Sequence, residues 1–204
     1  AEDAARLADR AVVLTGRPAQ VAEDVALPTP RARRSEETIA ADVHVKLKPR
    51  HPDLLTIVVP RHPERGDELE QQFKARGLKV GRRSRNDFIT PDTDILLGDS
   101  IGEMGLYLRL TEVAFVGRSL VQEGGQNPLE PARLGTAVLS GTNVQNFRDA
   151  YRRLIDRGGA RLVRDGEMLA GGVNYLLNNY KARRAMMQAG LAAGAGVQLE
   201  GLAG

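Results

Sequence analysis

Residues 124–131, Gly-Gly-Gln-Asn-Pro-Leu-Glu-Pro, form the stretch best suited to chemistry, and they lie between two apolar runs. The glycines suit a tight turn, Asn127 is a preferred helix N-cap, and Pro128 fits the first helical position. Glu130 falls three residues after the cap, where reciprocal capping and the helix dipole both favour a carboxylate. A glycine turn before a helix also exposes N–H groups to an anion or a sugar.

This stretch has two interpretations. In the first, it is a tight turn followed by a well-capped helix, and Glu130 serves the helix alone. In the second, the Glu130 carboxylate is free to accept hydrogen bonds from the ribose hydroxyls of a nucleotide. The stretch by itself does not decide between them.

A second polar stretch, residues 60–65, has the sequence Pro-Arg-His-Pro-Glu-Arg and directly follows an apolar run. The guanidinium of Arg61 could bind a phosphate or carboxylate through two hydrogen bonds. It could equally form a surface ion pair with Glu64 or Asp99. His62 is expected to be an ordinary loop histidine and not a catalyst.

A third stretch, residues 98–103, has the sequence Gly-Asp-Ser-Ile-Gly-Glu and follows another apolar run. Ser100 and Glu103 have the spacing of a capping box. The N–H group of Gly102 would then lie in the first turn of a helix, where it suits an anion or the edge of a base.

The pattern around these stretches predicts an α/β fold. Strand and helix patterns alternate from residue 54 onward, which indicates a Rossmann-like parallel sheet with helices on both faces. In such sheets ligands bind at the carboxyl ends of the strands, where all three stretches lie. We expect strands at residues 11–16, 54–59, 78–82, 94–97, 113–116, 137–139 and 161–163, and helices at 37–48, 67–76, 102–110, 146–157, 165–177 and 180–191.

Composition excludes several other functions. The 204 residues contain no cysteine and only three histidines, without metal-like spacing, so neither a disulfide nor a metal site is expected. Aromatic residues make up 4% with no Trp, which argues against nucleic-acid binding by base stacking. Tyr107 and Phe115 are expected in the core, and Arg82, Arg83 and Arg85 on a solvated basic face.

The three stretches together resemble the 3-deoxy-D-manno-octulosonic acid (Kdo) transferases. The third match is long, running from Phe115-Val116-Gly117 to residues 124–132. The resemblance implies the C-terminal half of a GT-B fold, which holds the donor CMP-Kdo. It assigns residues 37–204 to this Rossmann-like donor domain and residues 1–36 to the end of the N-terminal domain and an irregular linker. The implied donor-binding residues are Pro60, Arg61, Ile101, Gly102, Glu103, Asn127, Pro128, Leu129 and Glu130.

The resemblance also implies an activity. The intact protein would transfer Kdo from CMP-Kdo to a lipid A precursor during lipopolysaccharide biosynthesis, at the cytoplasmic face of the inner membrane. No cofactor, metal or nucleic acid takes part. The general base is expected to be a Glu of the N-terminal domain, so this chain alone is expected to be inactive.

One segment and two single positions depart from the family pattern. Residues 28–35 replace a Ser-Thr-His-Gly-Glu-Glu-like loop, of which only Glu36 and Glu37 match. Arg118 stands where a second glycine is usual, and Gln126 where His is common. The replaced loop and the missing catalytic half favour one alternative, a non-catalytic, degenerate GT-B domain. A GT-B enzyme that uses a UDP-sugar is a second alternative.

Overall fold

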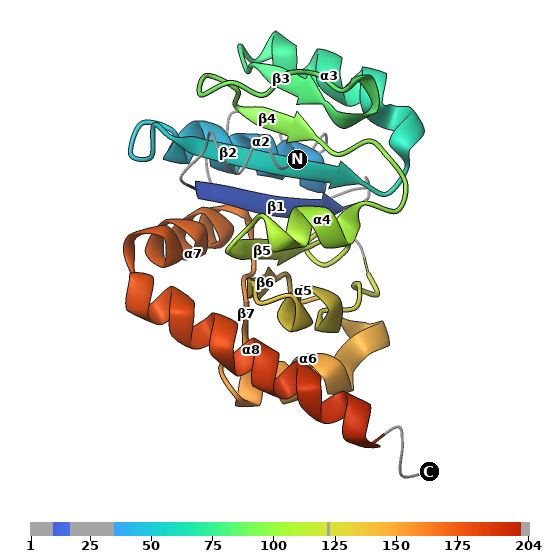
Figure 1. Cartoon of the computed structure of the whole chain (residues 1–204), viewed down its shortest axis with the longest axis vertical. Helices are drawn as coiled ribbons and strands as arrows, with labels where there is room; N and C mark the ends of the chain where they lie inside the picture. The colour runs from blue at the N-terminus through green and yellow to red at the C-terminus, as the bar shows by residue number, and fades with distance from the viewer. Residues whose placement is uncertain (1–9, 17–34, 122, 201–204) are drawn as a thin grey trace.

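A parallel seven-stranded sheet forms the centre of the computed structural model (Figure 1). The structure describes residues 10–16, 35–121 and 123–200, with only the backbone considered at 10–16 and 196–200. The strand order is β3-β4-β2-β1-β5-β6-β7, and every neighbouring pair is parallel. The strands are β1 (Arg10–Gly16), β2 (Leu54–Pro60), β3 (Val80–Arg82), β4 (Ile95–Leu97), β5 (Val113–Val116), β6 (Ala137–Ser140) and β7 (Ala160–Leu162).

The sheet is buried on both faces, as its continuous apolar runs require. All seven residues of β2 are buried. Leu54 and Val58 contribute to one core cluster, while Leu55 and Ile57 contribute to another. Because successive side chains of a strand point to opposite faces, a single strand supplies both layers of core.

Helices cover each face. α2 (Glu36–Leu47), α3 (Gly66–Ala75) and α7 (Gly166–Asn178) pack on the face of Leu54 and Val58. α4 (Met104–Arg109), α5 (Leu129–Arg133) and α6 (Arg148–Asp156) lie on the other, as Figure 1 shows for α4 in front of the sheet. The long helix α8 (Tyr180–Glu200) contacts the first cluster through Met186 and Met187 and the cluster of α5 through Ala193. Short 3-10 turns are η2 (Pro63–Arg65), η3 (Arg83–Arg85) and η4 (Gln145–Phe147). The predicted fold class is therefore confirmed.

The direction of the strand order changes at β1. The chain passes from β1 through α2 to β2 on one side, whereas β5 pairs with β1 on the other side. Such a switch point leaves room at the carboxyl ends of the two strands, because the connections leave in opposite directions. The fold thus predicts a ligand site beside the end of β5.

The structure corrects the predicted domain boundary at one element. The expected strand at residues 11–16 was assigned, within residues 1–36, to a preceding domain and linker. It forms β1, which pairs with both β2 and β5 at the middle of the sheet. The boundary between residues 36 and 37 is therefore wrong for this strand, because the strand's backbone hydrogen bonds join it to the donor-domain sheet. Residues 1–9 and 17–34 lie outside the described part of the chain.

Gly141 permits a close contact between two turns that follow β5 and β6. A Cβ atom at this position would lie 2.1 Å from the Ser119 carbonyl oxygen and 2.6 Å from the Leu120 nitrogen. The Gly141 N–H group also donates to Ser119 Oγ at 2.8 Å. Since backbone atoms occupy the space, they cannot rotate away from an added methyl group.

We therefore expect Gly141→Ala to lower the free energy of unfolding by about 3 kcal/mol or more, because it overpacks two backbone segments. Urea unfolding measures the effect. Gly171→Ala is the matched control, since a Cβ atom there meets nothing within 4 Å. Gly171 lies in α7, where alanine is the better helix former, so this variant should gain about 0.5–1 kcal/mol in the free energy of unfolding. Equal midpoints for the two variants would contradict the close contact.

Candidate functional site

The three polar stretches all begin at the carboxyl edge of the sheet. They follow β2, β4 and β5, which run parallel within the order β4-β2-β1-β5. The sequence-based expectation that they share one edge is confirmed. They are not equally close, however, because β1 separates β2 from β5.

The Gly124-Gly125 turn is fixed by the segment that follows β6. Both glycines have positive φ angles, 104° and 73°, which residues with a Cβ atom rarely adopt. The N–H group of Gly124 donates to Gln145 Oε1 at 3.0 Å, and that of Gly125 to the Arg118 carbonyl at 2.9 Å. A Cβ atom on Gly125 would lie 2.9 Å from the Asn143 carbonyl oxygen. The glycines therefore serve the turn itself, and the Gly125 N–H is not available to a ligand.

The helix start after this turn differs from the prediction. α5 begins at Leu129 with Pro128 at the N-cap, one residue later than expected. Asn127 still satisfies the helix start, because its side-chain oxygen accepts from the Leu129 N–H group at 3.0 Å. Glu130 makes no reciprocal capping bond, so the capping-box interpretation is wrong. Its exposed carboxylate has no hydrogen bond or ion pair with the described residues.

A cavity of about 370 Å³ lies beside this free carboxylate. Its inner wall is apolar and comes from α4 and β5, whereas its polar groups come from the stretch after the glycine turn. The lining residues are Met104, Leu108, Ala114, Phe115, Val116, Gln126, Asn127, Glu130 and Pro131. An apolar wall with a few polar groups is the usual composition of a small-molecule pocket, and this volume is typical.

Glu36 holds the turn after β5 from across the switch point. Its side chain is buried and accepts from the backbone N–H groups of residues 118–121, at 2.9 Å from Ser119 and 2.8 Å from Leu120. Burial raises the pKa of the Glu36 carboxyl, and these four N–H donors oppose that effect. Ser119 adds a bond of 2.6 Å from its hydroxyl to the Val116 carbonyl. The Glu36 carboxyl group thus fixes the turn by accepting four backbone hydrogen bonds.

Arg118 adopts a backbone conformation that suits glycine. Its φ angle is +55°, in the left-handed region. Glycine adopts this region without strain, whereas the Cβ atom of an arginine is strained there. The Arg118 N–H group donates to Glu36, and its carbonyl accepts from Gly125. These bonds hold the residue in a conformation that its Cβ atom disfavours.

The stretch after β4 is held by side chains and not by a capping box. α4 begins at Met104, and Glu103 at its N-cap makes no side-chain capping bond. Instead Ser100 Oγ donates to the Glu103 carboxylate, and Arg83 binds that carboxylate at 2.8 and 3.1 Å. Arg83 and Ser100 hold the pKa of Glu103 below its ordinary value. The prediction that Ser100 caps the helix backbone is wrong, because the acidic side chain competes for its hydroxyl.

Ile101 and Gly102 form the open part of this stretch. Ile101 is 88% exposed, and Gly102 has a φ angle of +82° with no atom near an added Cβ. Asp99, in contrast, is buried and bonded to Arg82 and Ser84. The expectation of a solvated basic face is wrong for Arg82, whose side chain is only 9% exposed.

Arg61 lies at the same edge but outside the cavity. It follows β2, which is two strand spacings or roughly 10 Å from β5. Its side chain is exposed and has no partner among the described residues, so the alternative of an ion pair with Glu64 or Asp99 is wrong. Glu64 pairs with His62 at 3.3 Å instead. Pro60 is buried at the end of β2.

The structure thus joins some predicted residues and separates others. Asn127 and Glu130 line the cavity. Glu103 does not line it but is adjacent in sequence to Met104, which does. Pro128 is buried and Leu129 packs on the core, so both hold the backbone between Asn127 and Glu130 in place. The sequence-based prediction missed the apolar wall at α4 and the role of Glu36. An apolar face on the predicted helix at residues 102–110 was the available signal for the wall.

Three known proteins illustrate what this chain is similar to. The chain is 36% identical over 156 residues to the 3-deoxy-D-manno-octulosonic acid transferase of Haemophilus influenzae, covering 76% of this chain and 36% of that protein. It is 40% identical over 139 residues to the Bordetella pertussis enzyme of the same name, covering 68% and 32%. The C-terminal CMP-Kdo binding domain of WaaA from Acinetobacter baumannii superposes with a TM-score of 0.78 and 28% identity, covering 94% and 96%. No protein-family model matches the sequence.

By its fold, the chain is a Rossmann-like domain of the kind that forms the C-terminal half of GT-B glycosyltransferases. Over the aligned residues it is a homologue of the 3-deoxy-D-manno-octulosonic acid transferases. It spans about a third of the length of these relatives, 36% and 32%. Within the described residues, every helix is too short or too polar to cross a bilayer.

Replacing Glu36 should destabilise the protein through the turn after β5. Glu36→Ala leaves four N–H groups without their acceptor, so we expect a loss of about 3 kcal/mol or more in the free energy of unfolding. Glu36→Gln keeps one acceptor oxygen and should lose about 1–2 kcal/mol. Chemical denaturation measures both losses. Similar small losses for the two variants would mean that water replaces the carboxylate.

Arg118→Gly should stabilise the protein. It removes the left-handed strain, which is worth about 1–2 kcal/mol. It also costs about 0.5–1 kcal/mol, because glycine gives the unfolded chain more conformational entropy. The expected net gain is about 1 kcal/mol, measured as a higher urea midpoint. Arg118→Ala is the control, because alanine keeps the Cβ atom and should gain nothing. A gain shared by both variants would assign the effect to the arginine side chain.

Proposed function

We propose that this chain is the donor-binding domain of a Kdo transferase and that its cavity holds the nucleotide of CMP-Kdo. One observation carries the proposal: an unpaired carboxylate, Glu130, stands at the mouth of an apolar cavity beside the end of β5. This is the switch point, where the strand order reverses, and such folds bind ligands there. The relationship to the transferases supports Kdo as the sugar.

Each part of a cytidine nucleotide has a suitable partner. The apolar wall of Met104, Leu108 and Ala114 suits the faces of a pyrimidine ring. The Glu130 carboxylate has several lone-pair sites and no donor, so it suits the adjacent hydroxyl groups of a ribose. The side chain of Arg61 is exposed, unpaired and positively charged, which suits a phosphate that extends from the cavity along the sheet edge.

The same groups suit the chemistry of transfer. When the acceptor hydroxyl attacks the anomeric carbon of Kdo, the bond to the phosphate oxygen breaks and CMP leaves with the electron pair. Negative charge then grows on that phosphate, and a neighbouring guanidinium stabilises it. We assign this role to Arg61 at the end of β2, and we assign no general base to the described residues.

The proposal extends to the acceptor and the location of the intact protein. We assign the acceptor to a lipid A precursor in lipopolysaccharide biosynthesis, and the location to the cytoplasmic face of the inner membrane. The relationship to the Kdo transferases is the support for both assignments. The donor site is the part of this function that can be tested on the chain itself.

We expect CMP to bind the chain and Glu130→Ala to weaken binding about tenfold or more, the value of one charge-assisted hydrogen bond. Isothermal calorimetry with CMP measures this. 2′-Deoxycytidine monophosphate should bind the original chain more weakly, while Glu130→Ala should no longer distinguish the two nucleotides. Glu123→Ala is the matched control, because Glu123 is also exposed but does not line the cavity.

Arg61→Ala provides the second arm of this experiment. It should weaken CMP about tenfold and leave cytidine, which lacks the phosphate, unchanged. Arg50→Ala is its control, because Arg50 is exposed just before β2 at the opposite edge. If the original chain shows no heat with millimolar CMP, donor binding is wrong. If UDP competes as well as CMP does, a UDP-sugar becomes the better assignment.

A further inference from the structure

Two consecutive arginines bind opposite ends of the stretch 98–103. Arg82 is the last residue of β3, and Arg83 begins η3 directly after it. Arg82 binds Asp99, near the start of the stretch, and Arg83 binds Glu103 at its end. Neither arginine was among the predicted site residues.

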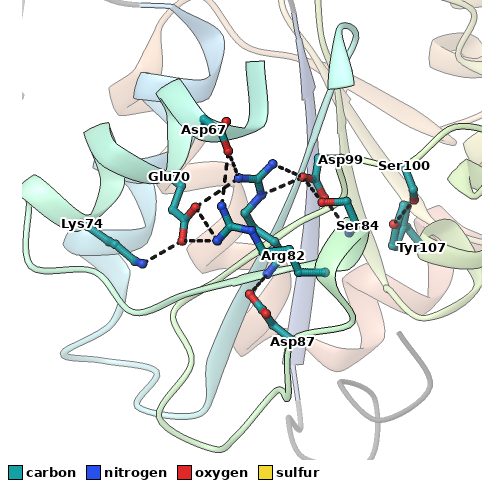
Figure 2. A network of polar contacts seen from close by, with 10 residues as sticks. Asp67, Glu70, Lys74, Arg82, Ser84, Asp87, Asp99, Ser100 and Tyr107 are labelled. Carbon is teal, nitrogen blue, oxygen red and sulfur yellow. Dashed lines mark hydrogen bonds and ion pairs between the residues drawn. The ribbon is translucent and has the colours of Figure 1, made fainter. Parts of the chain in front are cut away.

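Arg82 occupies a buried position among carboxylates, which Figure 2 shows from close by. Its Nη2 and Nε atoms lie 2.7 and 2.8 Å from Asp99 Oδ2, and its Nη1 atom lies 3.2 Å from Glu70 Oε2. Asp67 also accepts from Nη1. The guanidinium therefore joins the end of β3 to α3 and to the stretch after β4.

Asp99 receives further bonds from η3. Its carboxylate accepts from the Ser84 N–H group at 2.9 Å and from the Ser84 hydroxyl at 2.6 Å. Its burial would raise the pKa of the Asp99 carboxyl, but Ser84 and Arg82 hold that pKa below its ordinary value. A buried, ionised carboxylate with this many donors fixes the backbone to which it is attached.

Arg83 makes the matching contact on the α4 side. Its Nη2 atom lies 2.8 Å from Glu103 Oε1, and its Nε atom lies 3.1 Å from Oε2. The two-point geometry fixes direction as well as distance. Between Asp99 and Glu103 the chain presents Ile101 and Gly102 to solvent, next to Met104 in the cavity wall.

We propose that Arg82 and Arg83 are positioning residues, which set the backbone of residues 99–103 for the nucleotide, and that Arg82 does so without contacting it. This inference rests on the proposed donor site. Arg82 acts through Asp99, whose side chain is fully buried, while the Arg82 side chain is 9% exposed. A nucleotide in the cavity therefore contacts neither Arg82 nor Asp99. Substitution of either residue can change the affinity for the nucleotide only by moving the backbone of residues 99–103.

A double-mutant cycle tests this route. Arg82→Lys keeps the charge but loses the planar fork, and Asp99→Asn places an amide group against the guanidinium. Each change should weaken CMP binding about tenfold, and the double variant should bind no more weakly than either single variant. Multiplied losses in the double variant would overturn the proposal, because they would mean that the two residues act separately.

The matched control uses another arginine–aspartate pair. Arg76 donates to the buried carboxylate of Asp42, on the α2 side of α3 and away from the cavity. Arg76→Lys should lower the thermal midpoint as Arg82→Lys does but leave the CMP dissociation constant unchanged. An equal loss of affinity from both lysine variants would assign the effect to general destabilisation and overturn the positioning role.

Arg83→Lys keeps the test possible if Arg82→Lys does not fold. The Arg83 side chain is 31% exposed, so the protein should tolerate the change. We expect about tenfold weaker CMP binding with the thermal midpoint nearly unchanged. Failure of the original chain to bind CMP would reject the donor site. Normal CMP binding by all folded Arg82, Asp99 and Arg83 variants would reject the positioning role alone.

Discussion

The carboxylate of Glu36 is the interaction on which the ligand edge of this fold depends. It starts α2, the helix that leaves β1 on one side of the switch point, and bonds four N–H groups of the turn that leaves β5 on the other side. A parallel sheet leaves the donors of such turns unpaired at its carboxyl edge, where burial without a partner costs about 1–3 kcal/mol each. One side chain satisfies them together and so joins the two halves of the edge.

The neighbouring turns depend on this contact through a chain of further hydrogen bonds. The Arg118 carbonyl, next to the Glu36 contact, accepts from Gly125, and the Ser119 hydroxyl accepts from Gly141. The glycine turn and the start of α5 are thereby placed, and with them the carboxylate of Glu130. Strain at Arg118 is tolerated because the bonds around it over-determine its conformation.

The site therefore divides into groups that are satisfied within the protein and groups that are not. Glu36, Asp99 and Glu103 all accept several bonds from the chain and fix its backbone. Glu130 and Arg61 are exposed and unpaired. Their charges are therefore available to a ligand, and because the backbone that carries them is fixed, only their side chains must be ordered on binding.

The sequence predicted the order of strands and helices well, because continuous apolar runs and glycine stops are local signals. It also identified the three ligand-edge stretches, since the polar residues directly follow those runs. It failed where a polar side chain had two possible hydrogen-bond partners. The Ser100–Glu103 spacing fits a capping box, but the proximity of Arg83 and the Ser100 hydroxyl turned the acidic side chain away from the backbone.

What the sequence by itself determined is the α/β class and the chemical character of the edge, including Glu130 as a candidate for a ribose. The tertiary structure alone decided that β1 lies within the sheet, that Arg82 is buried, and that Glu36 serves the distant residues 118–121. The physical reason is sequence separation. Local patterns record which face of an element is apolar, whereas the partner of a charged side chain depends on which distant segment the folded sheet brings beside it.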